Sequence, residues 1–179
     1  MAEATNPLAA LVKPVIDRAS KDLNESVMAC RLGREGPTCM AVAISTQPIT
    51  VNIQVGTVLP LHATAQGKLW LAEVSAEERQ ARLKNYAMVA ISDNTIADKI
   101  QMEQEFERIR KQGFALNRGE NEPDIAAAAV PVRSEDGEIF LSLSAFGMLS
   151  RFSEALIRRA IDRLKSAAGE IRSARHEVA

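Results

Sequence analysis

The stretch LPLHATAQGK, residues 59–68, combines side chains that could perform chemistry at close spacing. A histidine beside a nucleophile can act as a general base, and a glycine-lysine pair is part of phosphate-binding loops. A helix that begins within this stretch would also point free backbone N–H groups at a carboxylate or a phosphate. Three interpretations follow: a catalytic loop, a phosphate cradle, or the anion-binding end of a helix.

Catalysis by His62 lacks its usual partners in the sequence. There is no G-x-S-x-G motif, and neither Cys30 nor Cys39 precedes a helix as activated thiolates usually do. The other histidine, His176, lies near the C-terminus, and no H-x-x-x-H or C-x-x-C spacing indicates a metal site. We therefore predict a structural or pocket-wall histidine, with no catalytic residue, metal or cofactor. An enzyme that uses His62 with Cys39 or a bound metal stays open as the alternative.

The phosphate cradle is disfavoured because a P-loop needs a second glycine five residues before Gly67, where the chain has His62. The helix N-terminus remains, with free N–H groups expected at Ala65, Gln66 and Gly67. These groups favour an anion without any basic side chain. The alternative is that Thr64 only caps a helix whose loop packs on the sheet.

Composition excludes several classes of protein. The 179 residues carry 23 acidic and 22 basic side chains, a formal net charge of −1, which is poorly suited to binding DNA or an anionic membrane. The two cysteines are too few for a disulfide framework, and we expect buried free thiols. Without a signal peptide or an apolar run of roughly 18 residues, we expect a soluble, cytoplasmic chain. We expect one domain, residues 6–175, after a disordered tail at 1–5.

Hydrophobic periodicity predicts the order helix, three strands, three helices, three strands, helix. Asn6 caps the first helix, a capping box links Ser75 and Glu78, and Gly113 ends the helix whose apolar side carries Ile100, Phe106 and Ile109. The predicted class is α+β, with an antiparallel sheet flanked by helices. The predicted helices are 7–23, 64–72, 75–83, 98–112 and 153–174, and the predicted strands are 26–32, 38–45, 49–55, 114–117, 125–132 and 138–147.

Two of these strands indicate a ligand cavity. The run IAAAAVPV, residues 125–132, is fenced by prolines into a space too short for a stable helix, so its alanines indicate a strand that something approaches closely. In the next strand, Ser142, Ser144 and Phe146 share one face. That face is directed either to solvent or to a cavity in which the hydroxyl groups orient a polar ligand.

The segments LPLHATAQGKLWLA, TIADKIQMEQEFERIRKQGFALNRGEN and AAAAVPVRSEDGEIFLSLSAFG, with the final helix, resemble the effector-binding domain of IclR-type transcriptional regulators. The resemblance covers roughly residues 6–175. It implies a GAF-like fold that binds a small metabolite, often an organic or aromatic acid, and thereby alters operator binding by a separate N-terminal winged helix-turn-helix domain. No such domain precedes Asn6, so we expect this chain to contact DNA only through a domain that it lacks. Family members assemble as dimers and tetramers.

The resemblance also implies an effector pocket. The amides of Ala65 and Gln66 would hold a carboxylate, and Phe146 stands where relatives have a serine. Some members carry an acid in place of Asn117, so this pocket would be more apolar at one end and favour bulkier or aromatic acids. A domain that only mediates oligomerisation, with its pocket filled by Phe146, is a further alternative. The implied pocket residues are Val51, Ile53, Ala65, Gln66, Asn117, Ala127, Ser144 and Phe146.

Overall fold

The computed structural model describes residues 6–178, so the expected tail at 1–5 lies outside the described residues. Within this range one five-stranded antiparallel sheet has the order β2-β1-β5-β4-β3. The strands are β1 (Ser26–Leu32), β2 (Pro37–Ala43), β3 (Ala115–Arg118), β4 (Ile125–Arg133) and β5 (Ile139–Met148). The helices are α1 (Pro7–Leu23), α2 (Ala65–Glu73), α3 (Ala76–Leu83), α4 (Lys99–Gln112) and α5 (Glu154–Val178), with a 3-10 turn η1 (Leu149–Arg151).

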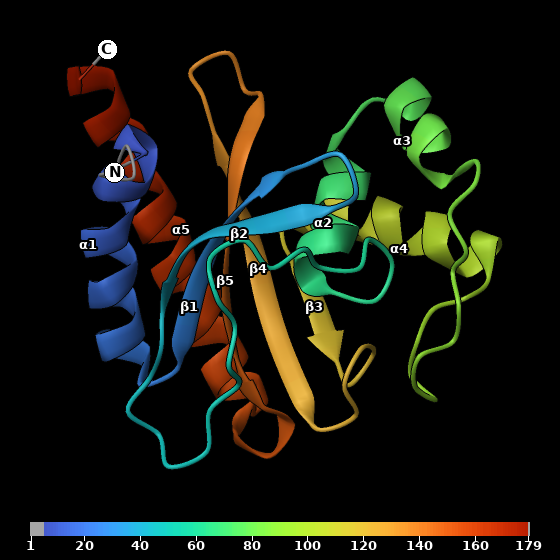
Figure 1. The fold of residues 1–179 in the computed structure, drawn as a ribbon, viewed down its shortest axis with the longest axis horizontal. Helices are drawn as coiled ribbons and strands as arrows, with labels where there is room; N and C mark the ends of the chain where they lie inside the picture. Colours follow the sequence, from blue (N-terminus) through green and yellow to red (C-terminus); the bar gives the residue numbers. More distant parts are fainter. Residues whose placement is uncertain (1–5, 179) are drawn as a thin grey trace, which may run out of the picture.

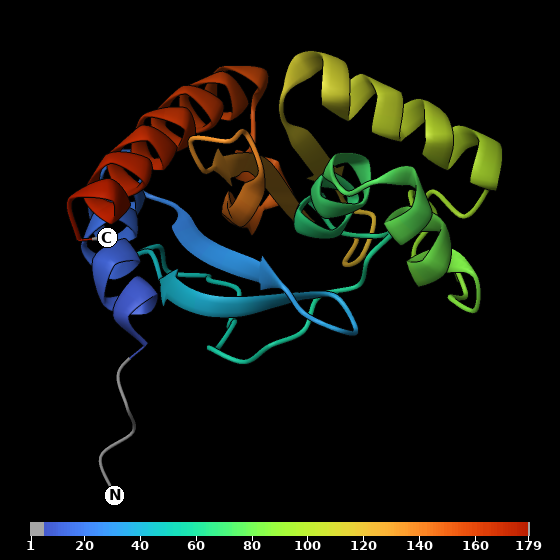
Figure 2. The same ribbon diagram turned by 90° about the horizontal axis from the view of Figure 1, so that it is seen from above.

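The helices form a layer on each side of the sheet (Figures 1 and 2). The long helices α1 and α5 lie side by side and bury their apolar stripes against one face. Helices α2 and α4 pack over the β3–β4 end of the opposite face, and α3 lies at its periphery. The α+β class with a sheet flanked by helices is therefore confirmed. No helix within residues 6–178 is long and apolar enough to cross a membrane.

The third predicted strand, residues 49–55, is wrong. The chain has no regular strand there and returns to the sheet only at an isolated bridge between Thr38 and Val58. The alternating side chains do not share one face, because Ile49 and Val55 are 63% and 65% exposed while Val51 and Ile53 pack inward. This segment crosses the outer face of β1 and β2 as a covering loop (Figure 1). The predicted meander of three strands is thus a hairpin of two.

The predicted helix ends are largely confirmed. Asn6, Thr64 and Ser75 each accept a hydrogen bond from a backbone N–H of the first helical turn, and Gly113 ends α4 with φ of 80°. The capping box forms only in part, since the Glu78 carboxylate pairs with Arg82. One of the three residues assigned to the apolar side of α4 is wrong, because Ile100 is 71% exposed. Met102 is buried in its stead, with Phe106 and Ile109.

Both faces of β5 are buried. Its leucines, with Ala145, pack against α1 and α5, while Ser142 and Ser144 point toward α2 and are 0% exposed. The solvent-facing interpretation of the two serines is therefore wrong. Ala127 and Ala129 of β4 face α2 and are small enough to let it approach the sheet closely, as expected from the alanine run. Ala126 and Ala128 lie on the opposite face, against α1 and α5.

Candidate ligand-binding site

A cavity of about 80 Å³ lies between the N-terminus of α2, the sheet and the covering segment 49–59. It brings together all eight residues singled out from the sequence. Residues of the covering segment, of α2 and of three strands thus meet although they are far apart in the chain. The eight are Val51, Ile53, Ala65, Gln66, Asn117, Ala127, Ser144 and Phe146. Sequence reasoning missed six further lining residues: Met28, Leu59, Thr64, Asn121, Glu122 and Ile125.

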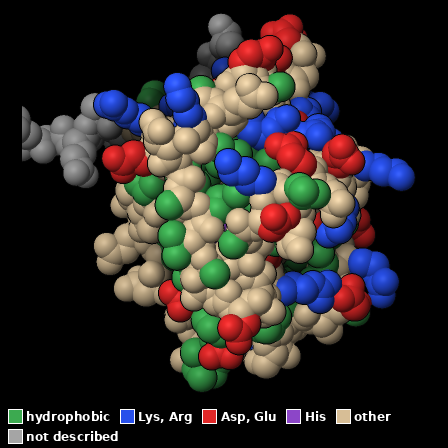
Figure 3. Space-filling view, turned by 90° about the vertical axis from the view of Figure 1, so that its right-hand side faces the viewer, with side chains coloured by type: hydrophobic (Ala, Val, Ile, Leu, Met, Phe, Trp, Pro, Cys, Tyr) green, Lys and Arg blue, Asp and Glu red, His purple; other side chains and the backbone are tan. Residues whose placement is uncertain are grey.

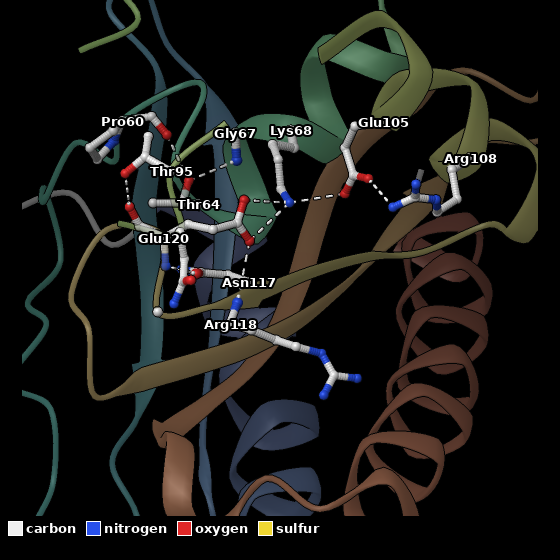
Figure 4. A network of polar contacts seen from close by, with 12 residues as sticks. Pro60, Thr64, Gly67, Lys68, Thr95, Glu105, Arg108, Asn117, Arg118 and Glu120 are labelled. Carbon is white, nitrogen blue, oxygen red and sulfur yellow. Dashed lines mark hydrogen bonds and ion pairs between the residues drawn. The ribbon is translucent and has the colours of Figure 1, made fainter. Parts of the chain in front are cut away.

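Thr64 holds the N-terminus of α2 in place at this cavity (Figure 4). Its hydroxyl donates to the Pro60 carbonyl at 2.7 Å and accepts from the Gly67 N–H at 3.0 Å. The expectation that the Gly67 amide is free was therefore wrong. The N–H groups of Ala65 and Gln66 have no acceptor within residues 6–178, and they remain available to an anion.

Gln66 is the polar side chain most deeply placed in the cavity wall. It is 1% exposed, its Nε2 donates to the Ser144 hydroxyl at 2.9 Å, and its Oε1 has no partner. Rotating the amide by half a turn would exchange these roles, with Ser144 donating to Oε1 and Nε2 left free. In either orientation one buried polar atom lacks a partner, which costs free energy that a ligand group could recover.

The remaining wall combines one more amide with apolar surface. Asn117 of β3 accepts from the Glu120 N–H at 2.8 Å through Oδ1, which leaves its NH₂ group as the donor for a ligand. Val51, Ile53 and Phe146 supply apolar surface, and Phe146 is buried. A polar end and an apolar wall suit a small amphipathic molecule with an acid or amide group.

His62 lies outside this cavity and is fully engaged elsewhere. Its Nδ1 is 2.9 Å from the Tyr86 hydroxyl, and its Nε2 is 2.8 Å from the Val89 carbonyl. The Tyr86 hydroxyl also accepts from the Leu61 N–H at 3.1 Å. His62 therefore ties the 86–89 segment to the loop before α2, and this geometry favours the structural role over that of a general base.

Lys68 has a role that sequence reasoning missed. It is 2% exposed, and its Nζ pairs with Glu105 Oε1 at 2.9 Å and with Glu120 Oε1 at 2.8 Å (Figure 4). Glu105 also binds Arg108 at 2.7 Å, and Glu120 Oε2 accepts from the Arg118 N–H at 3.2 Å. We call Lys68, Glu105 and Glu120 the buried ion triad. The carboxylates are 37 and 52 residues from Lys68 in sequence, so no local motif could pair them.

Two carboxylates of the triad already hold the Lys68 ammonium group, which disfavours the phosphate cradle. Burial raises the pKa of the Glu120 carboxyl, and the charge of Lys68 opposes that rise. No group of three or more His, Cys, Asp or Glu side chains within the described part of the chain is arranged to hold a metal ion. The two free cysteines, Cys30 and Cys39, are buried as expected.

Comparison with known proteins places this fold among bacterial regulators. The family model described as bacterial transcriptional regulator IclR C-terminal matches residues 3–173. The HTH-type transcriptional regulator XynR of Escherichia coli is 30% identical over 135 residues, which cover 75% of this chain and 53% of that protein. The chain spans about half the length of the curated relatives it matches, from 51% to 64%.

Solved structures share the whole arrangement of elements. The IclR protein of Thermotoga maritima aligns with a TM-score of 0.87 and 27% identity, over 96% of this chain and 68% of that one. An IclR homologue from Microbacterium hydrocarbonoxydans, solved with 4-hydroxybenzoate, aligns with a TM-score of 0.84 and 22% identity, over 96% and 69% of the two chains. The second likeness shows the fold alone, and together these matches confirm the GAF-like arrangement.

Proposed function

This chain belongs to the IclR family of bacterial transcriptional regulators, whose C-terminal domain it matches, and from that premise we propose that its cavity senses a small organic acid. The observation that carries the proposal is the buried Gln66, whose unpartnered polar atom stands beside the free amides at the start of α2. A carboxylate placed there would accept from the Ala65 and Gln66 N–H groups and lie near the positive end of the helix dipole.

The apolar wall favours an acid that carries a ring. With the carboxylate at α2, the remainder of the ligand would contact Val51, Ile53 and Phe146. The bound 4-hydroxybenzoate of the Microbacterium hydrocarbonoxydans homologue and the 3-hydroxybenzoic acid of an Acinetobacter PobR inducer-binding domain support an aromatic acid. Glu122 lies at the rim and would disfavour a second negative charge on the ligand.

The size of the cavity requires movement on binding. Its volume of about 80 Å³ is well below the roughly 300–1,000 Å³ of typical ligand pockets. We expect the covering segment 49–59 to move outward, because it contains no regular strand and a few hydrogen bonds of residues 56–59 hold it to β2. A ligand that binds the open and closed arrangements with different affinity shifts their populations, which is the requirement for a sensor.

In the whole protein, this shift would alter operator binding by a DNA-binding domain outside the present chain. The names of the curated relatives, such as the Pca operon regulatory protein of Acinetobacter baylyi, support regulation of transcription. Assembly into dimers or tetramers in the cytoplasm is part of the same proposal. The polar linker that contains Val89 and the helix α2 are the segments through which a neighbouring subunit would sense the change.

Thermal unfolding of this chain with small acids tests the proposal. Benzoate, 4-hydroxybenzoate and aliphatic acids would be compared with the corresponding amides and alcohols. A ligand at 100 times its Kd adds about 2.7 kcal/mol to the free energy of unfolding, which gives a clear shift in Tm. We expect a shift from an acid and none from its amide.

Matched variants locate the effect. Gln66→Leu keeps most of the side-chain volume but removes the polar atoms, and we expect it to abolish the shift. Gln101→Leu makes the same change at an exposed position of α4 and should preserve it. If no acid shifts the Tm of the folded protein, the anion site is refuted, and a domain that only mediates oligomerisation becomes the favoured interpretation. An acid response that persists in Gln66→Leu would place the site elsewhere.

A further inference from the structure

A β-bulge in β2 changes the face on which Cys39 lies. The β1–β2 register pairs Ala29 with Ala41 and then Cys30 with Cys39, so Met40 is an extra residue in β2. Such a bulge re-aims the side chains that follow it. Ala41 and Ala43 pack on the α1–α5 side, whereas Cys39 joins Cys30 on the opposite face. The residues around the two thiols there are Met28, Leu59 and Phe146, all of which line the cavity.

The backbone of Cys39 shows how closely the two cysteines approach. Its N–H donates to the Thr57 carbonyl and its C=O accepts from the Gly56 N–H, both at 2.8 Å. Both backbone groups of Cys39 therefore point away from β1, and Cys30 and Cys39 form a non-hydrogen-bonded pair of the antiparallel ladder. In such pairs the Cα atoms are about 4.5 Å apart. A disulfide accepts Cα separations of about 4.4–6.8 Å.

We propose that Cys30 and Cys39 are a redox-active dithiol that a peroxide closes into a cross-strand disulfide. The bulge places both thiols on one face, and the register holds them at bridging distance. A cysteine that only fills space in a core needs neither a second thiol on the same face nor one at bridging distance. The site is thus a modification site for small oxidants, distinct from the anion site at α2.

The two thiols have different roles in this reaction. The neighbouring Cys30 thiol lowers the pKa of Cys39, although burial opposes that shift, and the same interaction, with burial, raises the pKa of Cys30. The Cys39 thiolate attacks one peroxide oxygen, the O–O bond breaks, and the departing hydroxide takes a proton and leaves as water. Cys39 is then a sulfenic acid. The Cys30 sulfur attacks the Cys39 sulfur, the S–O bond breaks, and the hydroxyl group leaves as water with the Cys30 proton.

A small oxidant has a short route to the pair. Cys30 Sγ lies 3.9 Å from Met28 Sδ, and Met28 lines the cavity. The cavity volume of about 80 Å³ exceeds the roughly 10–15 Å³ that a cavity needs to hold one water molecule. Hydrogen peroxide is only slightly larger than water, so the cavity can hold it beside Met28, which contacts Cys30.

The experiment is intact-mass measurement of the fully reduced chain after treatment with hydrogen peroxide. The oxidant is removed with catalase, and the protein is denatured and alkylated. We expect a mass lower by two hydrogen atoms, no alkylation, and full recovery of two alkylated thiols after dithiothreitol. Peptide mapping should join Cys30 to Cys39 within one chain.

Variants that keep one of the two cysteines show which thiol attacks the peroxide and which attacks the sulfenic acid. Cys30→Ser retains the attacking thiol and should accumulate a sulfenic acid that dimedone traps, whereas Cys39→Ser should react more slowly and trap little. Circular dichroism checks that both variants fold. Two thiols that stay fully alkylatable after peroxide would overturn the proposal. A disulfide between two chains, or an oxygen added to Met28 alone, would overturn it as well.

These readouts need no ligand, so their failure and the failure of the proposed function are separate results. Where the sensor function holds, a ligand that fills the cavity should also slow oxidation of the pair. That protection rests on the proposed function and would be measured with the acid that shifts the Tm.

Discussion

The Lys68→Met substitution tests the account of the buried ion triad. It removes the ammonium group but keeps an apolar chain of similar length, so packing changes little. Glu105 and Glu120, each with a side chain only 8% exposed, would lose the buried cation that pairs with them. Breaking a buried ion pair by removing one partner costs about 3–5 kcal/mol. For a domain of this size, that loss lowers Tm by about 6–20 °C.

The loss should depend on pH with a defined sign. Removing the Lys68 charge, which opposes the effect of burial, should raise the pKa of the Glu120 carboxyl further. The pKa of Glu120 is already raised in the folded protein. A raised carboxyl pKa means that stability is greatest below the unfolded-state pKa and falls as pH rises through the folded-state pKa. The deficit of the variant should therefore be largest near pH 8.

Urea unfolding of both proteins between pH 5 and pH 8 measures this deficit. We expect it to shrink by about 1–3 kcal/mol toward pH 5, because a protonated carboxyl needs no counter-charge. Lys13→Met is the matched control, since the Lys13–Asp17 pair is about half exposed and should contribute at most about 0.5 kcal/mol. A deficit below about 1 kcal/mol at pH 8, or one that does not vary with pH, would refute the reasoning.

Two further substitutions test how α2 packs against the loop before it and against the sheet, and both are measured by urea unfolding. A Cβ on Gly67 would lie 2.3 Å from the Leu61 carbonyl oxygen, so Gly67→Ala should cost about 2–4 kcal/mol. A Cβ on Gly169, inside α5, would meet no atom within 4 Å, so Gly169→Ala should instead add about 0.5–1 kcal/mol to the free energy of unfolding. Equal effects at the two glycines would contradict this account. Ser142→Ala removes the acceptor 2.8 Å from the Trp70 indole N–H and should cost about 1–3 kcal/mol. Since the chain has one tryptophan, its fluorescence should also change, and an unchanged spectrum and stability would count against that bond.

Local patterns in the sequence were sufficient for most elements and for the cavity residues. Caps such as Asn6 and Thr64 act within one helical turn, so their effect can be predicted from neighbouring residues. The alternation of Ser142 and Ser144 with leucines predicted a shared face of β5 correctly. The positions around the cavity came from a family resemblance whose motifs span nearly the whole chain, and the structure brings them together.

The predictions that were wrong or absent share one physical cause, because each depends on contacts between residues that are distant in sequence. Alternation over 49–55 resembles a strand, yet a strand needs a partner with free backbone groups, and that segment lies across the sheet instead. The role of Lys68 depends on two acids on other elements. Whether Ser144 meets solvent or Gln66 depends on where α2 packs, which no local pattern specifies.

The covering segment has a second role at the margin of the sheet. β2 is an edge strand, and its outer backbone groups at Pro37 and Cys39 are satisfied by residues 56–59, through the bonds of Cys39 with Gly56 and Thr57 and of Leu59 with Pro37. Unsatisfied edges are templates on which other chains add strands and aggregate. Any movement that lifts this segment to admit a ligand therefore also exposes the edge of β2, on which another chain could add a strand. Ligand entry and resistance to aggregation depend on the same few hydrogen bonds, so variants that bind faster should also precipitate sooner.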